Sequence, residues 1–162
     1  MDKKVLDPCC ATKSMWFDKN DLRCHFADSR KGIMKVSKWK SQKGRSDKVV
    51  KPCELHDFRK MNFANNSFHH IVFDPPHLRN LSEKSAIGFM YGSLDPKTWR
   101  DDLKRGFAEC FRVLKPNGTL IFKWNEIDIP LKEILRLTDQ KPLYGHKSGK
   151  KAKTHWVAFI KD

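Results

Sequence analysis

Four consecutive residues, Asp74-Pro75-Pro76-His77, combine groups that could act on an amine. They follow His70-Ile71-Val72-Phe73, an apolar run that predicts a buried central strand of a parallel sheet. An amino group on an aromatic ring is a poor nucleophile because its lone pair is delocalised into the ring. The Asp74 carboxylate and the Pro75 carbonyl could accept the two amine hydrogens, with the prolines holding that carbonyl in place and His77 stacking on the ring. The pattern therefore predicts a site that prepares a planar amine for attack on an electrophile.

Acidic residues also end two earlier predicted strands. Val5-Leu6 leads into Asp7, and an apolar run over 22–27 ends at Asp28. Asp28 lies 21 residues after Asp7, close to the ~20-residue spacing at which a carboxylate accepts hydrogen bonds from ribose hydroxyls. The spacing fits an adenosine-type ligand, and the alternative is an ordinary loop aspartate.

The elements that must position these residues alternate between strands and helices, in one domain over residues 1–162. Apolar residues recur every three or four positions over 95–114, which predicts an amphipathic helix. Asp57 with Phe58, after the third strand, could bond an adenine amino group and cover its face. The alternation predicts an α/β fold, a Rossmann-like doubly wound sheet that is mostly parallel with an antiparallel closing strand pair, and ligands at the strand carboxyl ends. Further strands are expected at 5–6, 22–27, 49–50 or 53–55, 68–73, 119–124, 143–144 and 155–160, and further helices after Ser14 over 15–17 and at 129–137.

The chain is strongly basic, with 33 Lys and Arg residues against 19 Asp and Glu residues and a formal net charge of +14 over 162 residues. Residues 30–51 contain nine basic residues and one acid, Asp47, which predicts a basic loop insertion. The alternative is a solvated, partly disordered insertion. A tryptophan among lysines suits a surface that stacks on bases and neutralises phosphates, and no amphipathic apolar face of the membrane-binding kind is present. The expected substrate-binding residues are Lys35, Lys38, Trp39, Lys40, Lys43 and Arg45.

Five cysteines occur without any Cys-x-x-Cys pair, which indicates free, mostly buried thiols and a reducing, cytoplasmic setting. No apolar run approaches the ~20 residues of a membrane span. Cys24-His25 and Cys53-x-x-His56 place thiols and imidazoles in two neighbourhoods, but their spacing is not that of a structural zinc site. The sequence therefore predicts no metal.

Three segments, in order along nearly the whole chain, resemble a class I S-adenosylmethionine-dependent methyltransferase of the amino-methylating kind with an Asp/Asn-Pro-Pro-aromatic motif. They are Val5-Leu6-Asp7-Pro8-Cys9-Cys10-Ala11-Thr12-Lys13-Ser14, then Asn66-Ser67-Phe68-His69-His70-Ile71-Val72-Phe73-Asp74-Pro75-Pro76, then Arg112-Val113-Leu114-Lys115-Pro116-Asn117-Gly118-Thr119-Leu120. The resemblance implies S-adenosylmethionine as cofactor. It places the target amine on Asp74, Pro75, Pro76 and His77, and the cofactor on Asp7, Pro8, Cys9, Cys10, Ala11, Asp28, Asp57 and Phe58.

The chain departs from the family pattern at three positions. Ala11 and Lys13 stand where the family's first turn has glycines, which let the backbone approach a ligand closely. Lys13 must then point outward or toward the cofactor carboxylate. His77 stands where an aromatic residue is commoner, and we expect its ring to be neutral because a charged ring would repel the sulfonium.

The substrate that fits best is RNA, methylated on an exocyclic amine such as adenine N6 or guanine N2. No residues remain for the target-recognition domain that sequence-specific DNA methyltransferases usually append, and RNA offers unstacked bases to a small basic domain. The segment 80–95 is a second expected contact surface. DNA ranks second and a protein or small-molecule amine third. A nucleic-acid-binding or partner subunit that keeps the fold without activity stays open, whereas a nucleotide-dependent oxidoreductase lacks its Gly-x-Gly-x-x-Gly turn.

Overall fold

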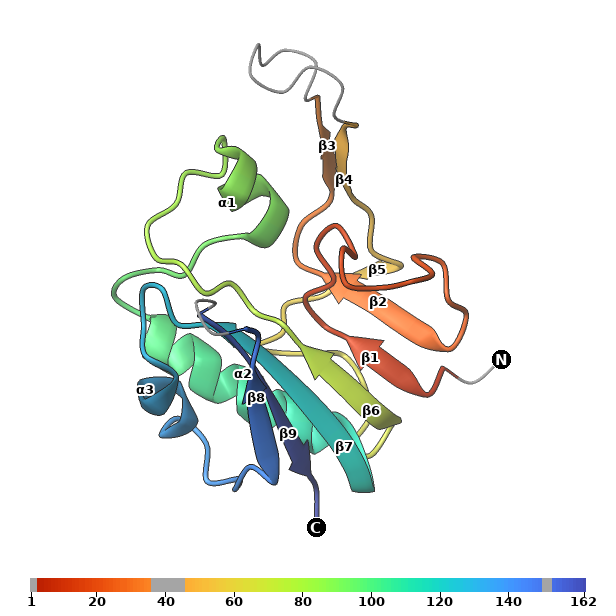
Figure 1. The fold of residues 1–162 in the computed structure, drawn as a ribbon. Helices are drawn as coiled ribbons and strands as arrows, with labels where there is room; N and C mark the ends of the chain where they lie inside the picture. The colour runs from red at the N-terminus through yellow and green to blue at the C-terminus, as the bar shows by residue number, and fades with distance from the viewer. Residues whose placement is uncertain (1–2, 36–45, 150–152) are drawn as a thin grey trace.

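The computed structural model describes residues 3–35, 46–149 and 153–162, and its centre is a seven-stranded sheet (Figure 1). The strand order is β5-β2-β1-β6-β7-β9-β8. The strands of this sheet are β1 (Val5–Asp7), β2 (Cys24–Asp28), β5 (Glu54–Leu55), β6 (Phe68–Phe73), β7 (Leu114–Asn125), β8 (Tyr144–Lys147) and β9 (Thr154–Ile160).

The pairing of these strands confirms the predicted fold class. Strands β5, β2, β1, β6 and β7 pair in parallel, while β9 runs antiparallel to both β7 and β8. The predicted strand at 68–73 is confirmed with the same bounds, and the closing pair at the end of the chain is confirmed as β8 and β9.

Two helices cover one face of the sheet. Helix α2 (Trp99–Val113) buries the side that carries Leu103, Phe107 and Cys110, as its apolar spacing predicts. These residues share one core with apolar residues of β6 and β7 and with Ile134 of α3 (Leu131–Leu135). Burial of this core is the main source of the stability of the fold. Figure 1 shows α2 and α3 on the same side of the sheet, and within the described residues no helix lies over the opposite face.

On the opposite face, the described residues form an apolar cluster near β1 and β2. A small cluster of Cys10, Cys24 and Phe26 forms there, with Trp16 packed edge-on against Phe26. The residues around Trp16 form turns, so the prediction of a short helix over 15–17 is wrong. Forming the first turn of a helix costs more free energy than three residues recover, and too few apolar residues follow Trp16 at helical spacing to extend it.

Three further features differ from the sequence prediction. Both candidates for the third strand are strands, but only β5 joins the main sheet, while β4 (Lys48–Val50) pairs with β3 (Gly32–Met34) in a separate hairpin. The basic segment is therefore a hairpin at its described ends. Helix α1 (Ala86–Tyr91) was not predicted, since it has six residues and depends on a local cap in which the Ser85 hydroxyl accepts from the Gly88 amide. In Figure 1 both α1 and the hairpin project beyond the carboxyl ends of the parallel strands. Among the described residues no helix is long and apolar enough to cross a membrane.

Candidate active site

Three carboxylates gather at the carboxyl edge of the sheet. Asp7 and Asp28 are the last residues of β1 and β2, and Asp74 directly follows β6. These strands are neighbours in the order β2-β1-β6, so the three side chains come from adjacent strand ends. The edge is where ligands bind in open α/β sheets.

Asp7 lies at the centre of this edge and is only 1% exposed. Its carboxylate accepts hydrogen bonds from the Cys9 amide at 3.2 Å and from Trp16 Nε1 at 2.8 Å. Burial raises the pKa of Asp7 to about 7, and the negative charges of Asp74 and Asp28 add to this shift. Asp7 is thus the most buried acid of this edge, and both of these hydrogen-bond donors are neutral.

The loop after Asp7 keeps the backbone shape that glycine normally provides. Ala11 has a φ of 47° and Lys13 a φ of 53°, both in the left-handed region. The Ala11 amide donates to Asp28 Oδ2 at 2.9 Å, which locks the first of these residues. The Lys13 ammonium turns toward the Lys19 carbonyl at 3.0 Å and lies 4.1 Å from the centre of the Phe26 ring. Pro8, Cys9 and Cys10 of this loop are buried.

Arg30 connects Asp28 to helix α1. Its guanidinium contacts both oxygens of the Asp28 carboxylate, through Nε at 3.0 Å and Nη2 at 3.1 Å, and its Nη1 donates to the Phe89 carbonyl at 2.8 Å. The Asp28 carboxylate expected to hold a ribose is thus engaged by its own neighbours. Arg30 thereby links the end of β2 to helix α1.

Asp57 and Phe58 line a hollow of about 270 Å³ beyond the ends of β2 and β5. Arg59 binds both Asp57 oxygens, with contacts of 2.7 to 3.0 Å, which lowers the pKa of Asp57. Phe58 is half-buried against Phe73 and so close to α2 that a Cβ at Gly106 would lie 2.7 Å from its ring. We call this space the Asp57 hollow; its other lining residues are Ser29, Arg30, Arg59, Pro76, Leu81, Glu83, Ser93, Leu94, Asp95 and Asp102.

Asp74 is paired with Lys123 of β7. The Lys123 ammonium lies 2.6 Å from Asp74 Oδ2, and the Asp74 side chain is 11% exposed. Burial raises the pKa of Asp74, while the charge and hydrogen bond of Lys123 oppose that rise. Within the described residues Asp74 Oδ1 accepts no hydrogen bond, so one oxygen of this carboxylate is open to a ligand.

A second hollow, of about 360 Å³, opens beside Asp74 and Lys123. His77 lies on its wall with its ring centre 6.3 Å from that of Tyr91, and burial lowers the pKa of His77. The exposed side chains Ile87 and Ile127 give this space an apolar rim. We call it the Asp74 hollow; its other lining residues are Leu78, Asn125 and Thr154.

The Asp-Pro-Pro-His loop lies between the two hollows. Asp74 and His77 face the hollow on the β7 side, whereas Pro76 lines the hollow on the β2 and β5 side. Pro75 is buried between them. Asp7 and Asp28 line neither hollow but occupy the strand ends next to the loop. The geometry thus provides two ligand spaces separated by one rigid segment.

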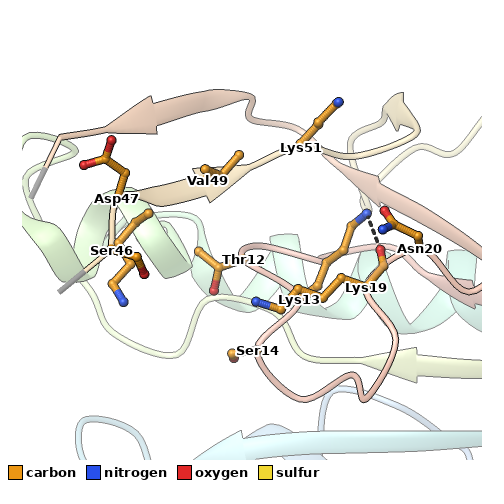
Figure 2. Close-up of a pocket in the computed structure, with 10 residues that line it drawn as sticks. Thr12, Lys13, Ser14, Lys19, Asn20, Ser46, Asp47, Val49 and Lys51 are labelled. Atoms are coloured by element: carbon orange, nitrogen blue, oxygen red, sulfur yellow. Dashed lines mark hydrogen bonds between the residues drawn. The ribbon is translucent and has the colours of Figure 1, made fainter.

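A third feature of this end of the molecule is a basic groove between the loop after β1 and the hairpin (Figure 2). Four lysines line it, and its one acid, Asp47, pairs with Lys35 at 2.9 Å. We call it the lysine groove; it is lined by Thr12, Lys13, Ser14, Lys19, Asn20, Ser46, Asp47, Lys48, Val49 and Lys51. Of the expected substrate-binding residues only Lys35 is described, because Lys38, Trp39, Lys40, Lys43 and Arg45 lie outside the described residues.

Sequence reasoning missed Lys123, Tyr91 and Arg30 as site residues. Lys123 carried a usable signal, since it is a lone charge that follows the apolar run Leu120-Ile121-Phe122 in the predicted strand at 119–124. The contacts of Arg30 with Phe89 and of Tyr91 with His77 join segments that are distant in the sequence, so no local pattern predicts them. The thiols were interpreted correctly except at Cys53, which is exposed.

Comparison with known proteins supports the fold. Neither a family model nor a curated protein sequence matches the chain. A protein from Pyrococcus horikoshii matches with a TM-score of 0.60 and 16% identity, over 98% of this chain and 82% of that one. An S-adenosylmethionine-dependent methyltransferase from Methanosarcina mazei matches with a TM-score of 0.58 and 12% identity, over 99% and 92% of the two chains. A TehB-like S-adenosylmethionine-dependent methyltransferase from Corynebacterium glutamicum gives 0.53 and 13%, over 99% and 81%. The chain thus has the fold of S-adenosylmethionine-dependent methyltransferases.

Proposed function

We propose that this protein is an S-adenosylmethionine-dependent N-methyltransferase that acts on an exocyclic amine of a nucleic-acid base, with RNA favoured over DNA. The proposal rests on Asp74 Oδ1, the carboxylate oxygen that accepts no hydrogen bond from the described residues. Asp74 directly follows β6 and lines a hollow bordered by the rings of His77 and Tyr91. A carboxylate acceptor beside ring-bearing walls suits a planar base with an amino group. The fold supplies the context for methyl transfer.

The charges at the strand ends fit the cofactor. Burial raises the pKa of Asp7 to about 7, and the negative charges of Asp74 and Asp28 add to that shift. A cationic sulfonium close to Asp7 would favour its ionised form. The Asp57 hollow lies beyond the ends of β2 and β5, where the adenosine of the cofactor is expected. When bound, S-adenosylmethionine supplies a methyl group on an electrophilic carbon.

The catalytic contribution of the protein is positioning. Asp74 Oδ1 accepts one amine hydrogen, and the carbonyl of Pro75 accepts the other, so that the nitrogen lone pair is directed toward the cofactor side of the loop. Lys123 favours the ionised form of the Asp74 carboxylate and orients it through its other oxygen. A neutral His77 packs against the base without repelling a sulfonium, in line with the lowered pKa of that residue. No strong base is needed.

The lysine groove supports a nucleic-acid substrate. Its lysines Lys13, Lys19, Lys48 and Lys51 lie at the same end of the molecule as the two hollows. Phosphates bound there would leave an adjacent unstacked nucleotide to enter the Asp74 hollow.

A second candidate is a nucleic-acid-binding or partner subunit without activity. The observation in its favour is that Arg30 engages both oxygens of Asp28 and Arg59 both oxygens of Asp57. These are the two carboxylates expected to hold the ribose and the adenine. Cofactor binding therefore requires both arginines to share or release their partners.

The deciding experiment measures transfer of tritiated methyl to total RNA, total DNA and protein, followed by nucleoside analysis of the labelled fraction. We expect label in an amino-methylated nucleoside of RNA. Asp74→Ala, which removes the acceptor oxygen, should lower the rate by at least about 100-fold, comparable to loss of a strong transition-state hydrogen bond, with cofactor affinity nearly unchanged. Asp139→Ala, at an exposed aspartate away from both hollows, is the matched control.

Lys123→Met separates an orienting role from a merely structural one. Without the ammonium, the main opposition to burial is lost, so the pKa of Asp74 rises further and the rate should increase with pH over a higher range than in the unmodified protein. An unchanged pH profile contradicts the role given to Lys123. Absence of cofactor binding at millimolar concentration, by calorimetry, supports the second candidate, and label confined to DNA overturns the preference for RNA.

A further inference from the structure

Two histidines and a glutamate converge at the far edge of the sheet, away from the Asp-Pro-Pro-His loop. His25 lies in β2, Glu54 in β5, and His56 directly follows β5. The register pairs Ala27 with Glu54, and alternate residues of a strand face the same way, so all three side chains belong to the face covered by α2. The fold thereby brings together His25 and His56, which are 31 positions apart in the sequence.

The distances within this cluster match those between ligands of one small cation. Glu54 Oε2 lies 3.3 Å from His25 Nε2, and Glu54 Oε1 lies 3.1 Å from His56 Nε2. One ligand atom from each residue can be chosen so that all three fall within 4.8 Å of one another. Bonds of about 2.0–2.2 Å to a tetrahedral zinc ion place neighbouring ligands about 3.3 Å apart, so closing the triad requires only small side-chain rotations.

Neither imidazole is satisfied by the glutamate alone. Nε2 of His25 and Nε2 of His56 are buried and make no hydrogen bond with the described residues, because the nearby carboxylate lies off the direction that a hydrogen bond requires. The His56 side chain is 6% exposed, so water reaches it poorly. A buried ring nitrogen without a partner is costly, and a metal ion that both nitrogens face removes that cost.

The contrast with a third histidine shows what is particular to this cluster. His155 Nε2 is also buried beside a carboxylate, Glu126, at 2.8 Å. That carboxylate already binds the ammonium of Lys147 at 3.1 Å, and no second imidazole adjoins it in the described part of the chain. Among the described residues, only the cluster on β2 and β5 supplies three ligands.

The surroundings hold both rings in place. Phe63 packs against His56 with ring centres 4.5 Å apart and against His25 at 5.1 Å. One contact competes, since the Asn62 amide points at His56 Nδ1, where the proton must reside when Nε2 binds a metal. At 3.5 Å that contact is at the outer limit of a hydrogen bond and is readily given up.

We propose that His25, Glu54 and His56 form a binding site for a zinc-type divalent ion, with two imidazole nitrogens, one carboxylate oxygen and a fourth position open to solvent beside the exposed Glu54. The ion joins β2 to the edge strand β5 and anchors the turn that carries Asp57 and Phe58. Its role is structural and separate from methyl transfer. The sequence prediction of no metal considered each histidine together with its nearest cysteine. Cys24, however, lies in the cluster on the opposite face of the sheet.

The test is a zinc titration of chelator-treated protein in competition with a chromophoric chelator. We expect one equivalent of Zn²⁺ to bind, and Co²⁺ as a spectroscopic probe to give visible bands of a four-coordinate nitrogen and oxygen site. His56→Gln and Glu54→Gln should each lower Zn²⁺ affinity by more than about tenfold. Glu54 is 55% exposed, so its variant tests the site without disturbing the core.

His146→Gln, at an exposed histidine of β8, is the control for adventitious imidazole binding and should retain the full stoichiometry. Zn²⁺ should raise the melting temperature of the unmodified protein and of this control by several degrees, and leave both cluster variants unchanged. Failure of the unmodified protein to bind one equivalent at micromolar concentration overturns the proposal. So does equal binding by all four proteins, because that places the ion elsewhere.

Discussion

The carboxylates of the candidate site differ in what surrounds them. Asp28 and Asp57 are neutralised by arginines, and Asp74 by Lys123, while Asp7 has only neutral donors. Asp7 is therefore the acid whose charge state changes near neutral pH, with a pKa of about 7. A residue chosen from sequence as a motif acid thus has a second property, sensitivity to pH, that only its burial reveals.

This property predicts that cofactor affinity depends on pH. Above pH 7 Asp7 is ionised and attracts a sulfonium, whereas below pH 7 it is protonated and the attraction is lost. Affinity for S-adenosylmethionine should therefore fall about tenfold from pH 8 to pH 6, equivalent to about 1.4 kcal/mol. The uncharged thioether product, S-adenosylhomocysteine, should bind almost independently of pH over this range. Calorimetric titration of both ligands measures the difference, and parallel pH dependence for the two contradicts the role of Asp7.

The pairing of Asp74 with Lys123 marks the limit of sequence reasoning at this scale. Asp74 could be identified because the two following prolines and the preceding apolar strand form a local pattern. Its partner lies 49 residues away and becomes a neighbour only because β6 and β7 pair in parallel. The Arg30 contact with α1 has the same character. The residues of the motif can therefore be identified from the sequence, whereas the residues that pair with them become neighbours only in the tertiary structure.

At the scale of elements, the loop after β1 retains its shape without the usual glycines. A residue with a Cβ in the left-handed region costs roughly 1–2 kcal/mol relative to glycine. Ala11→Gly should therefore stabilise the protein by about 1 kcal/mol in denaturant unfolding, because the Ala11 amide keeps its bond to Asp28 while the strain is removed. Ala108→Gly, at an exposed position of α2, is the opposite control and should destabilise by about 1 kcal/mol through lost helix propensity. Equal destabilisation by both substitutions contradicts strain at Ala11.

The elements that were predicted well are those with strong local patterns. The strand at 68–73 is a continuous apolar run ended by two prolines, and α2 has apolar residues at regular helical spacing. Short elements were predicted poorly, because α1 depends on one serine cap and β3 is recognised only by its pairing with β4. Residues after Ser14 contain apolar side chains, but Trp16 is used to cover β2 and bond Asp7 rather than to extend a helix.

At the scale of the whole molecule, the helices and the ligand spaces are segregated. Both sheet-covering helices lie on one face, and the two hollows with the lysine groove lie at the carboxyl end. The loop after β1 and the β3–β4 hairpin form the walls of the lysine groove at that end. The groove is thus built from segments outside the helical layer.

This arrangement predicts which lysines govern the salt dependence of RNA binding. Each phosphate contact to a single strand contributes about −0.7 to the slope of log affinity against log salt concentration. Replacing Lys19 and Lys51 together by alanine should therefore make the slope shallower by about 1.4, with similar weakening for unrelated sequences. Both are exposed in the groove and neither ion-pairs with an acid in the described part of the chain. Lys104→Ala with Lys132→Ala changes the net charge by the same amount on the helical face and should leave the slope nearly unchanged. Equal effects of the two double variants, measured by fluorescence anisotropy from 50 to about 300 mM salt, would mean that RNA senses only the overall charge and not the groove.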